Sequence, residues 1–210
     1  QLSIVVIMGV MNNTLIKYGA QSEFGADIPM TVVGIVMKVF QIVIAFVVGI
    51  AAGCQPIVGY NYGAGHLHRV KRIYRTMLVA EIVIGAVATV CFELFPVQII
   101  RLFGSEGDLY NQFAAMSFRI FLSMMLLCCV QKSTSIFLQA LGKPIMSMTL
   151  SLLRDFILSV PLILILPGVF DLGVVGPLYS GPIADIVSFL VAVAMMVRVF
   201  GKMNLQMERG

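Results

Sequence analysis

Residues 31–53 read TVVGIVMKVFQIVIAFVVGIAAG, and Lys38 is the only charged side chain in that stretch. A helix needs about 20 predominantly apolar residues to cross the hydrocarbon core of a bilayer. The stretch lacks the alternation of apolar and polar residues that a membrane β-strand shows over about ten residues. It therefore predicts a transmembrane helix, whose apolar character extends outward to about residues 28–57.

The composition of the whole chain repeats this pattern. Of 210 residues, 60% are hydrophobic and 11% are charged, whereas a soluble domain is about 45–50% apolar and about 25% charged. A soluble globule of this size needs a wettable surface, so the composition excludes a soluble enzyme and a disordered chain. The net charge of +4 reflects basic loops rather than a nucleic-acid partner. The fold class is predicted to be all-α integral membrane.

Six apolar segments account for most of the length and predict a six-transmembrane-helix bundle in the lipid bilayer. They cover about residues 1–18, 28–57, 73–95, 111–138, 144–166 and 174–199. Glycines and polar residues place the connection between the second and third segments at residues 59–69. The chain opens at Gln1 inside an apolar run, without an initiator methionine or signal-peptide features. We interpret the first span as truncated and the chain as a fragment of a longer protein.

The distribution of charge predicts the orientation, because Lys and Arg concentrate on cytoplasmic loops. With six spans, one side collects the basic run at residues 66–75, Lys143, Arg198, Lys202 and Arg209. The other side has Lys17 and Arg101 but is rich in acids, namely Glu23, Asp27, Glu106, Asp108 and Asp171. The basic side and the C-terminus are therefore expected in the cytoplasm.

Charged residues at membrane depth usually face a bundle interior or a wet cavity, because exposure to lipid is costly. Eight such residues are balanced in sign: Lys38, Glu81, Glu93, Arg119, Lys132, Arg154, Asp155 and Asp185. This balance indicates pairing. Depth along the helices leads to the hypothesis that Asp185 or Asp155 neutralises Lys38 or Arg119. The alternative is a charge cluster that only holds the helices together.

One face of the second segment carries small and polar residues at intervals of three or four, namely Gly34, Lys38, Gln41, Ala45, Gly49 and Ala52. Small residues permit close helix packing, so this stripe is either a packing surface or the lining of a transport cavity. Asn12 and Asn13 need partners in an apolar layer, and they either face a cavity or bridge helices. The candidates for a substrate cavity are Asn12, Asn13, Lys38, Gln41, Arg119, Asp155 and Asp185.

Signatures of catalysis and metal binding are missing from the sequence. The four cysteines lie in apolar stretches without metal-ligand spacing, and His66 and His68 lack further ligands nearby. There is no Walker loop and no hydrolase or metalloprotease motif. We therefore expect no catalytic residue, no metal site and no cofactor. An ion gradient is then the economical source of energy for any transport.

Residues 55–64, QPIVGYNYGA, closely resemble a signature of the multidrug and toxic compound extrusion (MATE) family. The matching positions are Gln55, Pro56, Gly59, Tyr60, Asn61, Tyr62, Gly63 and Ala64. Further matches are FLQALGKP at residues 137–144, Pro161 in the fifth segment, and GPIAD at residues 181–185, which includes Gly181 and Pro182. The resemblance implies a structural or gating role for these motif residues.

The family implies twelve spans in two six-helix lobes, with a central cleft that opens alternately to each face. Residues 1–210 resemble the C-terminal lobe, spans seven to twelve, with the seventh cut short and the N-terminal lobe of the same parent as its partner. The implied function is secondary active efflux of lipophilic, often cationic, drugs across the bacterial cytoplasmic membrane, coupled to H⁺ or Na⁺.

This sequence departs from the family at the coupling site. Some members place ion-binding carboxylates in the seventh and tenth spans. The first segment here has no Asp or Glu, and the corresponding part of the fourth has Cys128, Cys129 and Gln131. Coupling is therefore expected to depend on the N-terminal lobe.

Two other functions compete with multidrug efflux. A lipid-linked saccharide flippase of the same superfamily would be expected to have a strongly cationic cavity, whereas the membrane charges here balance. A non-transporting membrane scaffold would explain the packing stripes but not those balanced charges.

Overall fold

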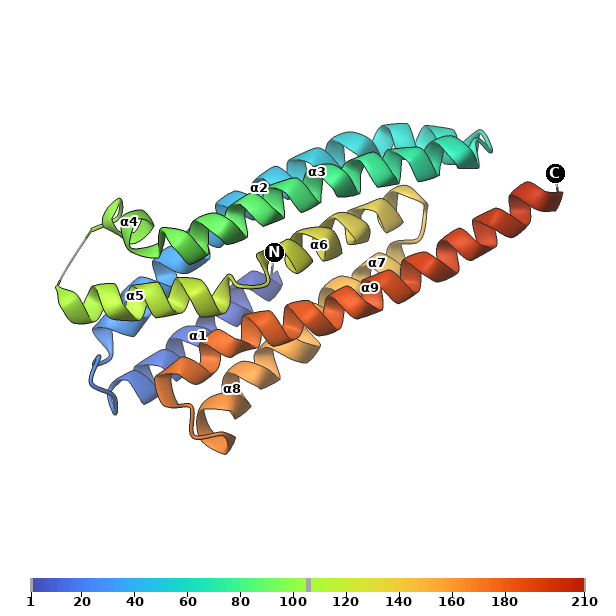
Figure 1. Ribbon diagram of the computed structural model, residues 1–210. Coiled ribbons are helices and arrows are strands. Elements are labelled where there is room, and N and C mark those ends of the chain that lie inside the picture. Colours follow the sequence, from blue (N-terminus) through green and yellow to red (C-terminus); the bar gives the residue numbers. More distant parts are fainter. Residues whose placement is uncertain (1, 105–106, 210) are drawn as a thin grey trace.

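The computed structural model describes residues 2–104 and 107–209, and these ranges are almost entirely helical (Figure 1). The elements are α1 (Leu2–Gly19), α2 (Asp27–Gly63), α3 (Leu67–Leu94), α4 (Pro96–Arg101), α5 (Asp108–Phe121), α6 (Met125–Ala140), α7 (Pro144–Leu152), the π-helix η1 (Leu153–Ser159), α8 (Val160–Val169), the 3₁₀-helix η2 (Gly173–Val175) and α9 (Gly176–Arg209). The prediction of an all-α fold is confirmed. Glu106 and the side chain of Arg209, both used in the charge argument, lie outside the described residues.

Several helices are long and apolar enough to cross a membrane. Within the described residues these are α2, α3, the continuous segment Pro144–Val169 and the segment Gly173–Met207. The pair α5 and α6 adds a fifth crossing if the two helices form one bent span. Helix α1, with 18 residues, matches the first predicted segment. The chain is a multi-pass membrane protein.

The connections gather at the two ends of the bundle. In Figure 1 the α2–α3 connection, the α6–α7 connection and the C-terminus lie at one end, while the α1–α2 connection, α4 and the α8–α9 connection lie at the other. The basic residues at 66–75, Lys143 and Lys202 therefore belong to the same end of the bundle. This grouping is the one that the charge pattern predicted.

The connection predicted at residues 59–69 is shorter in the structure, so the predicted bounds were wrong. Helix α2 continues through the glycine-containing motif to Gly63, and α3 already begins at Leu67. The basic run therefore lies mostly on the first turns of α3 rather than in a loop. Val58 and Asn61 are buried against neighbouring helices, so tertiary packing overrides the weak helix propensity of the glycines and asparagine.

Two of the predicted spans are interrupted. The fourth segment is divided at residues 122–124 into α5 and α6, which are bent by 47°. Ser123 donates its hydroxyl to the Ile120 carbonyl at 2.8 Å, which satisfies a backbone acceptor at the end of α5. The fifth segment contains the π-helix η1, which ends two residues before Pro161, whose ring nitrogen has no hydrogen to donate. Pro161 led us to expect an interruption of the fifth segment, whereas the division of the fourth segment was not predicted.

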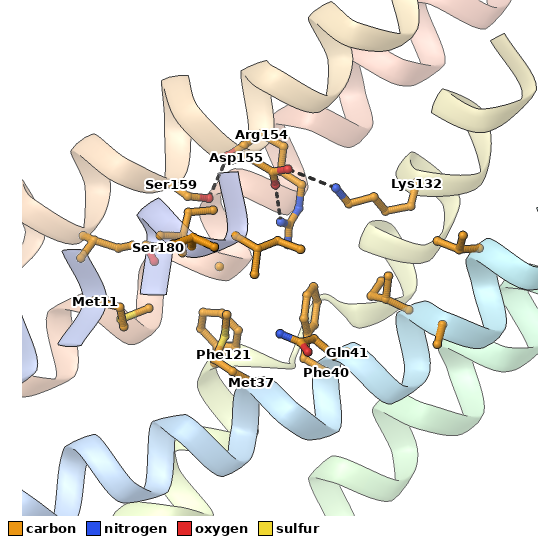
Figure 2. Close-up of a pocket in the computed structure, with 18 residues that line it drawn as sticks. Met11, Met37, Phe40, Gln41, Phe121, Lys132, Arg154, Asp155, Ser159 and Ser180 are labelled. Carbon is orange, nitrogen blue, oxygen red and sulfur yellow. Dashed lines mark hydrogen bonds and ion pairs between the residues drawn. The ribbon is translucent and has the colours of Figure 1, made fainter. Parts of the chain in front are cut away.

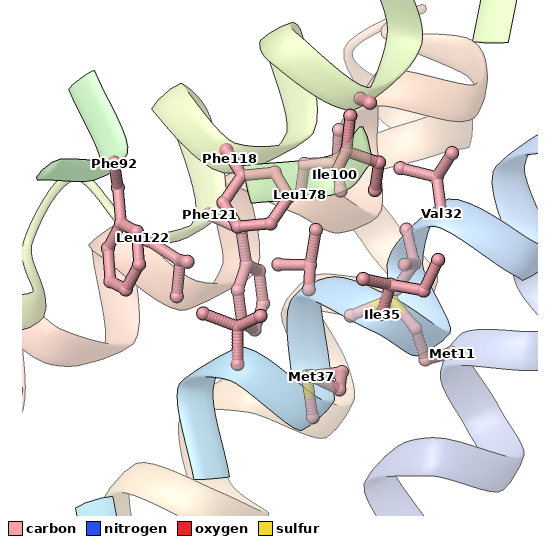
Figure 3. Packing of buried hydrophobic residues seen from close by; sticks show 14 of the residues in the cluster. Met11, Val32, Ile35, Met37, Phe92, Ile100, Phe118, Phe121, Leu122 and Leu178 are labelled. Carbon is pink, nitrogen blue, oxygen red and sulfur yellow. The ribbon is translucent and has the colours of Figure 1, made fainter. Parts of the chain in front are cut away.

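The buried apolar residues form two clusters, one toward each end of the bundle. Figure 3 shows part of the first cluster, in which Phe118, Phe121 and Leu178 approach residues of α2 and α1. Three segments contribute to both clusters, with a stretch of chain between the two contributions. The stretch runs from Cys129 to Phe137 on α6, from Leu178 to Ala192 on α9, and from Leu150 to Ile163 between α7 and α8. Lys132, Asp185, Arg154 and Asp155 fall in those stretches. These four of the eight charged residues therefore occupy a layer between two apolar cores.

Candidate functional site

A cavity of about 500 Å³ opens beside this charged layer. Most of its wall is apolar, and the charged groups gather on one side (Figure 2). It is lined by Ile4, Val5, Ile7, Met11, Met37, Phe40, Gln41, Ile44, Ala45, Val48, Phe121, Lys132, Arg154, Asp155, Ser159, Ile163, Ser180 and Gly181. Ligand sites commonly combine such a wall with a few convergent polar groups.

Four side chains form what we call the ionic network: Lys132, Arg154, Asp155 and Asp185. Arg154 donates from Nε to Asp185 Oδ1 at 2.7 Å and from Nη1 to Asp155 Oδ1 at 2.9 Å. Lys132 Nζ reaches the other oxygen of Asp155, Oδ2, at 3.3 Å. Two cations and two anions alternate along this chain of contacts, so the network is neutral overall. Opposite charges that are paired and hydrogen-bonded can be retained in a low-dielectric interior.

The segment that holds the network is the π-helix η1. Arg154 and Asp155 are consecutive residues, and both are buried. The Ser159 hydroxyl donates to the Arg154 carbonyl at 2.8 Å, five residues earlier, which is also the spacing of the backbone hydrogen bonds in a π-helix. Single π-turns are frequent at functional sites. Here the turn carries two neighbouring side chains into one cluster, and Pro161 follows it.

Aromatic rings face the charges across the cavity (Figure 2). The Arg154 guanidinium carbon lies 5.5 Å from the centre of the Phe40 ring, a distance at which cation–π attraction operates. Phe40 and Phe121 meet edge to face, with centroids 6.2 Å apart. An added Cβ at Gly181 would lie 3.0 Å from the Phe121 ring, so glycine is what allows α9 to approach it this closely. The cavity thus combines an aromatic pair with a carboxylate and two cations.

The structure brings some of the predicted cavity residues together and separates others. Gln41 and Asp155 line the cavity, and Asp185 is buried behind it as the partner of Arg154. Asn12, Asn13 and Lys38 are exposed on this chain and do not line the cavity. Arg119 is also exposed and donates from Nε to the Glu93 carbonyl at 3.2 Å.

The hypothesis that Asp185 or Asp155 neutralises Lys38 or Arg119 was therefore wrong about the cations. Arg154 and Lys132 take that role. Depth alone could not distinguish them, because helices at one depth can point side chains in any direction around their axes. The sequence did contain one indication of the correct pairing. Arg154 and Asp155 are adjacent in an apolar segment, where charged side chains usually pair with charged groups on other helices.

Sequence reasoning missed most of the apolar lining and its two serines. Phe40, Met37 and Ser180 line the cavity, yet in the sequence they resemble ordinary core or packing residues. Ser159 and Ser180 donate to backbone carbonyls within their own segments, at 2.8 Å and 2.6 Å. Only the proximity of α1, α2, η1 and α9 in the fold reveals the shared cavity.

The two sequence motifs lie against each other at the end of the bundle that carries the basic residues. Gln55 of α2 donates from Nε2 to the Ile136 carbonyl and to Gln139 Oε1, each at 3.5 Å. A Cβ on Gly59 would lie 3.6 Å from the Ala140 carbonyl oxygen, so the helices are close at this point. The first motif therefore packs its helix against the end of α6, where the second motif begins.

Within the first motif the remaining side chains differ in their surroundings. Asn61 is buried and donates from Nδ2 to the Ile57 carbonyl at 2.8 Å. Tyr62 packs against the second apolar cluster. Pro56, Tyr60 and Gly63 are exposed on this chain. The motif thus has one face that joins α2 to α6 and one face that is free of contacts within the described residues.

Comparison with known proteins agrees with this architecture. The MatE family model matches residues 5–165. A curated relative, "Probable multidrug resistance protein YoeA" of Bacillus subtilis (strain 168), is 29% identical over 155 residues, covering 72% of this chain and 33% of that protein. The chain thus spans about a third of the length of this relative.

Solved structures share the fold. An outward-facing conformation of a multidrug resistance MATE family transporter of the MOP superfamily has a TM-score of 0.83 at 18% identity, covering 97% of this chain and 44% of that one. An inward-facing conformation of a multidrug resistance MATE family transporter of the MOP superfamily has a TM-score of 0.78 at 21% identity, covering 96% and 46%. Because the family model covers well over half of the sequence, this chain belongs to the MatE family.

Proposed function

We propose that this chain forms the C-terminal lobe of a secondary transporter that exports lipophilic, often cationic, compounds. The N-terminal lobe of the same parent chain would supply the other half of the transport pathway. The partial coverage of its relatives supports this reading, because the fold matches less than half of each solved structure. The proposed location is the bacterial cytoplasmic membrane, with the basic end and the C-terminus in the cytoplasm.

The observation that carries the proposal is the cavity with its ionic network. The apolar wall and the Phe40–Phe121 pair suit the lipophilic part of a substrate, and aromatic faces also attract cations. Asp155 offers the only carboxylate among the lining residues of the described structure. A bound cation would compete with Lys132 for Asp155 Oδ2, the longer of the two contacts that this carboxylate makes.

Alternating access follows from two lobes that rock against each other about such a site. This lobe resembles the corresponding half of both an outward-facing and an inward-facing transporter. A lobe whose fold fits both forms is suited to move largely as a rigid body, with the cleft opening on one side and then the other. The buried Arg154–Asp185 pair would keep the lobe intact during that motion.

The driving ion is proposed to be H⁺ or Na⁺, with no cofactor. Helix α1 has no carboxylate, so coupling is assigned to carboxylates of the N-terminal lobe acting together with carboxylates of this lobe that lie outside α1. A flippase for lipid-linked saccharides would be expected to have a strongly cationic cavity. Here the cavity wall carries two cations and one carboxylate, and the whole ionic network is neutral, so the cavity is not strongly cationic, which supports export of cations over that alternative.

The test is efflux from cells. The complete parent protein is expressed in a drug-hypersensitive bacterium, and ethidium efflux is followed with and without an ionophore that collapses the ion gradients. We expect efflux that the ionophore abolishes. Efflux that persists with the ionophore contradicts gradient coupling, and absence of efflux for ethidium and other lipophilic cations contradicts the export proposal. The 210-residue lobe alone should not transport, because it has half of the proposed pathway.

A further inference from the structure

Glu81 lies at the middle of α3 and is completely buried, yet it takes no part in the ionic network. Neither of its carboxylate oxygens has a hydrogen-bond partner among the described residues. A carboxylate that is buried without a partner loses the hydration that stabilises its charge. An ionised Glu81 would therefore be strongly unfavourable at this position, unless a bound cation or proton neutralises its charge.

The surroundings of Glu81 form a packed surface that we call the α3–α6 seam. On α3 it consists of Val70, Tyr74, Met77, Glu81, Gly85 and Phe92, all buried and spaced at helical intervals. The Tyr74 ring lies 4.5 Å from that of Phe137 on α6, and its hydroxyl is 3.0 Å from Thr134 Oγ1.

One turn beyond Glu81, the seam is at its tightest. An added Cβ on Gly85 would lie 2.7 Å from Leu126 Cα and 3.4 Å from Cys129 Sγ. Backbone contact at Gly85 and aromatic contact at Tyr74 thus enclose Glu81 from both directions along the helix.

Few titratable groups face Glu81 from the helices packed against α3. The thiol of Cys54 approaches from α2, and that of Cys129 from α6. Asp185 of α9 also interacts electrostatically with Cys129, but its carboxylate accepts a hydrogen bond from Arg154. No cation contacts Glu81 within the described residues, so none of these groups supplies the positive charge that an ionised Glu81 would need.

We propose that Glu81 is a proton-binding site enclosed in the α3–α6 seam, separate from the substrate cavity, and that it exchanges its proton when the seam opens. In the packed state the carboxyl group is neutral and keeps its proton. When α6 moves away from α3, water reaches the group, accepts the proton and leaves a solvated carboxylate. The exchange step rests on the proposed transport function, whereas the bound proton does not.

The fold places a point of bending beside this seam. Gly85 packs against Leu126, in the first turn of α6, directly after the 47° bend that separates α5 from α6. A change in that bend would shift α6 against α3 at the turn next to Glu81. This local shift of α6 would accompany the largely rigid movement of the lobe, because small sliding of packed helices is one way in which proteins change conformation.

Infrared spectroscopy tests the bound proton directly. The complete protein is reconstituted in lipid at neutral pH, with glutamate isotopically labelled to separate its signals from those of aspartate. We expect a C=O stretch of a protonated glutamic acid that is lost in Glu81→Gln and kept in Glu93→Gln, a matched variant near the end of the same helix. Absence of the band in the unmodified protein, or its persistence in Glu81→Gln, overturns the proposal.

Efflux in proteoliposomes with an imposed pH gradient tests the exchange. Glu81→Gln should still bind tetraphenylphosphonium but lose the stimulation of efflux by the gradient, while Glu81→Asp should keep both. Retained stimulation in Glu81→Gln contradicts the exchange step. If the unmodified protein moves no compound at all, the proposed transport function fails, and the infrared band still decides whether Glu81 holds a proton. Retained binding of tetraphenylphosphonium shows that the variant is folded.

Discussion

Arg154 Nε lies 2.7 Å from Asp185 Oδ1, which ties η1 to α9 in the centre of the bundle. Both side chains are almost fully buried. The two residues lie 31 positions apart in the chain, so the contact joins two neighbouring spans rather than two turns of one helix. A buried ion pair need not add net stability relative to apolar residues, but removing one partner leaves the other charge stranded.

Asp185→Asn should therefore destabilise the protein strongly. We expect a loss of about 3–5 kcal/mol in the free energy of unfolding, the range found when one partner of a buried pair is removed. Unfolding in detergent micelles, followed with increasing denaturant, measures this loss. Asp171→Asn is the matched control, since Asp171 is exposed, and it should change the free energy little. Equal effects of the two variants would contradict a structural role for the pair.

Lys132→Met should increase affinity for lipophilic cations. Lys132 occupies Asp155 Oδ2 at 3.3 Å, so its removal frees that oxygen for a bound cation. A hydrogen bond to a charged group contributes about 1.5–3 kcal/mol, which corresponds to roughly tenfold or more in Kd. Equilibrium binding of tetraphenylphosphonium to the complete protein measures the change. Lys38→Met is the control and should leave Kd unchanged, whereas weaker binding by Lys132→Met would show that Asp155 does not receive the cation.

Phe40→Leu should weaken the binding of aromatic cations. The Phe40 ring lines the cavity and meets Phe121 edge to face. Aromatic contacts contribute about 0.5–1.5 kcal/mol beyond area burial, which corresponds to roughly two- to tenfold in Kd. Ethidium binding by fluorescence measures this loss. Phe170→Leu, an exposed position at the end of α8, is expected to bind ethidium normally. An equal loss in both variants would place the ethidium site elsewhere.

Gly85→Ala should destabilise the α3–α6 seam. The new Cβ would lie 2.7 Å from Leu126 Cα, a backbone atom that cannot rotate away, so the helices must separate. Overpacking of this kind costs about 1–3 kcal/mol. Gly49→Ala in α2 is the control, because nothing lies within 4 Å of its added Cβ. Thermal unfolding of the two variants gives the comparison, and a midpoint for Gly85→Ala equal to that of Gly49→Ala would contradict close packing here.

Hydropathy was sufficient to predict an all-α fold and the places of its long apolar helices. The stretch around Lys38 became α2, and the basic run at residues 66–75 lies at the end of the bundle that holds Lys143. These features depend on the bilayer thickness and on charge distribution, which a sequence displays directly. The same reasoning expected Asp155 and Asp185 inside the helix bundle, where both are buried.

The partners within the membrane could not be predicted in the same way. The rotation of each helix about its axis decides whether Asp185 meets Lys38 or Arg154, and that rotation depends on packing along the whole span. The π-turn at η1 changes the direction of every later side chain in its segment. The bend before Met125 contains neither proline nor glycine, the residues from which a bend is usually predicted. Such features arise from tertiary contacts, as at Gly181 and Phe121.

Gln41 and Lys38 lie one turn apart on α2, and both were predicted to line a cavity, but Gln41 alone lines the one described. The central claim is that substrate binds in that cavity within the lobe. The complete protein is made free of its native cysteines, and either Gln41→Cys or Lys38→Cys is introduced. The rate of reaction with a thiol reagent is then measured with and without tetraphenylphosphonium. The account predicts that the cation slows labelling at Gln41→Cys and leaves Lys38→Cys unaffected. Protection at Lys38→Cys alone, or at neither position, would contradict it.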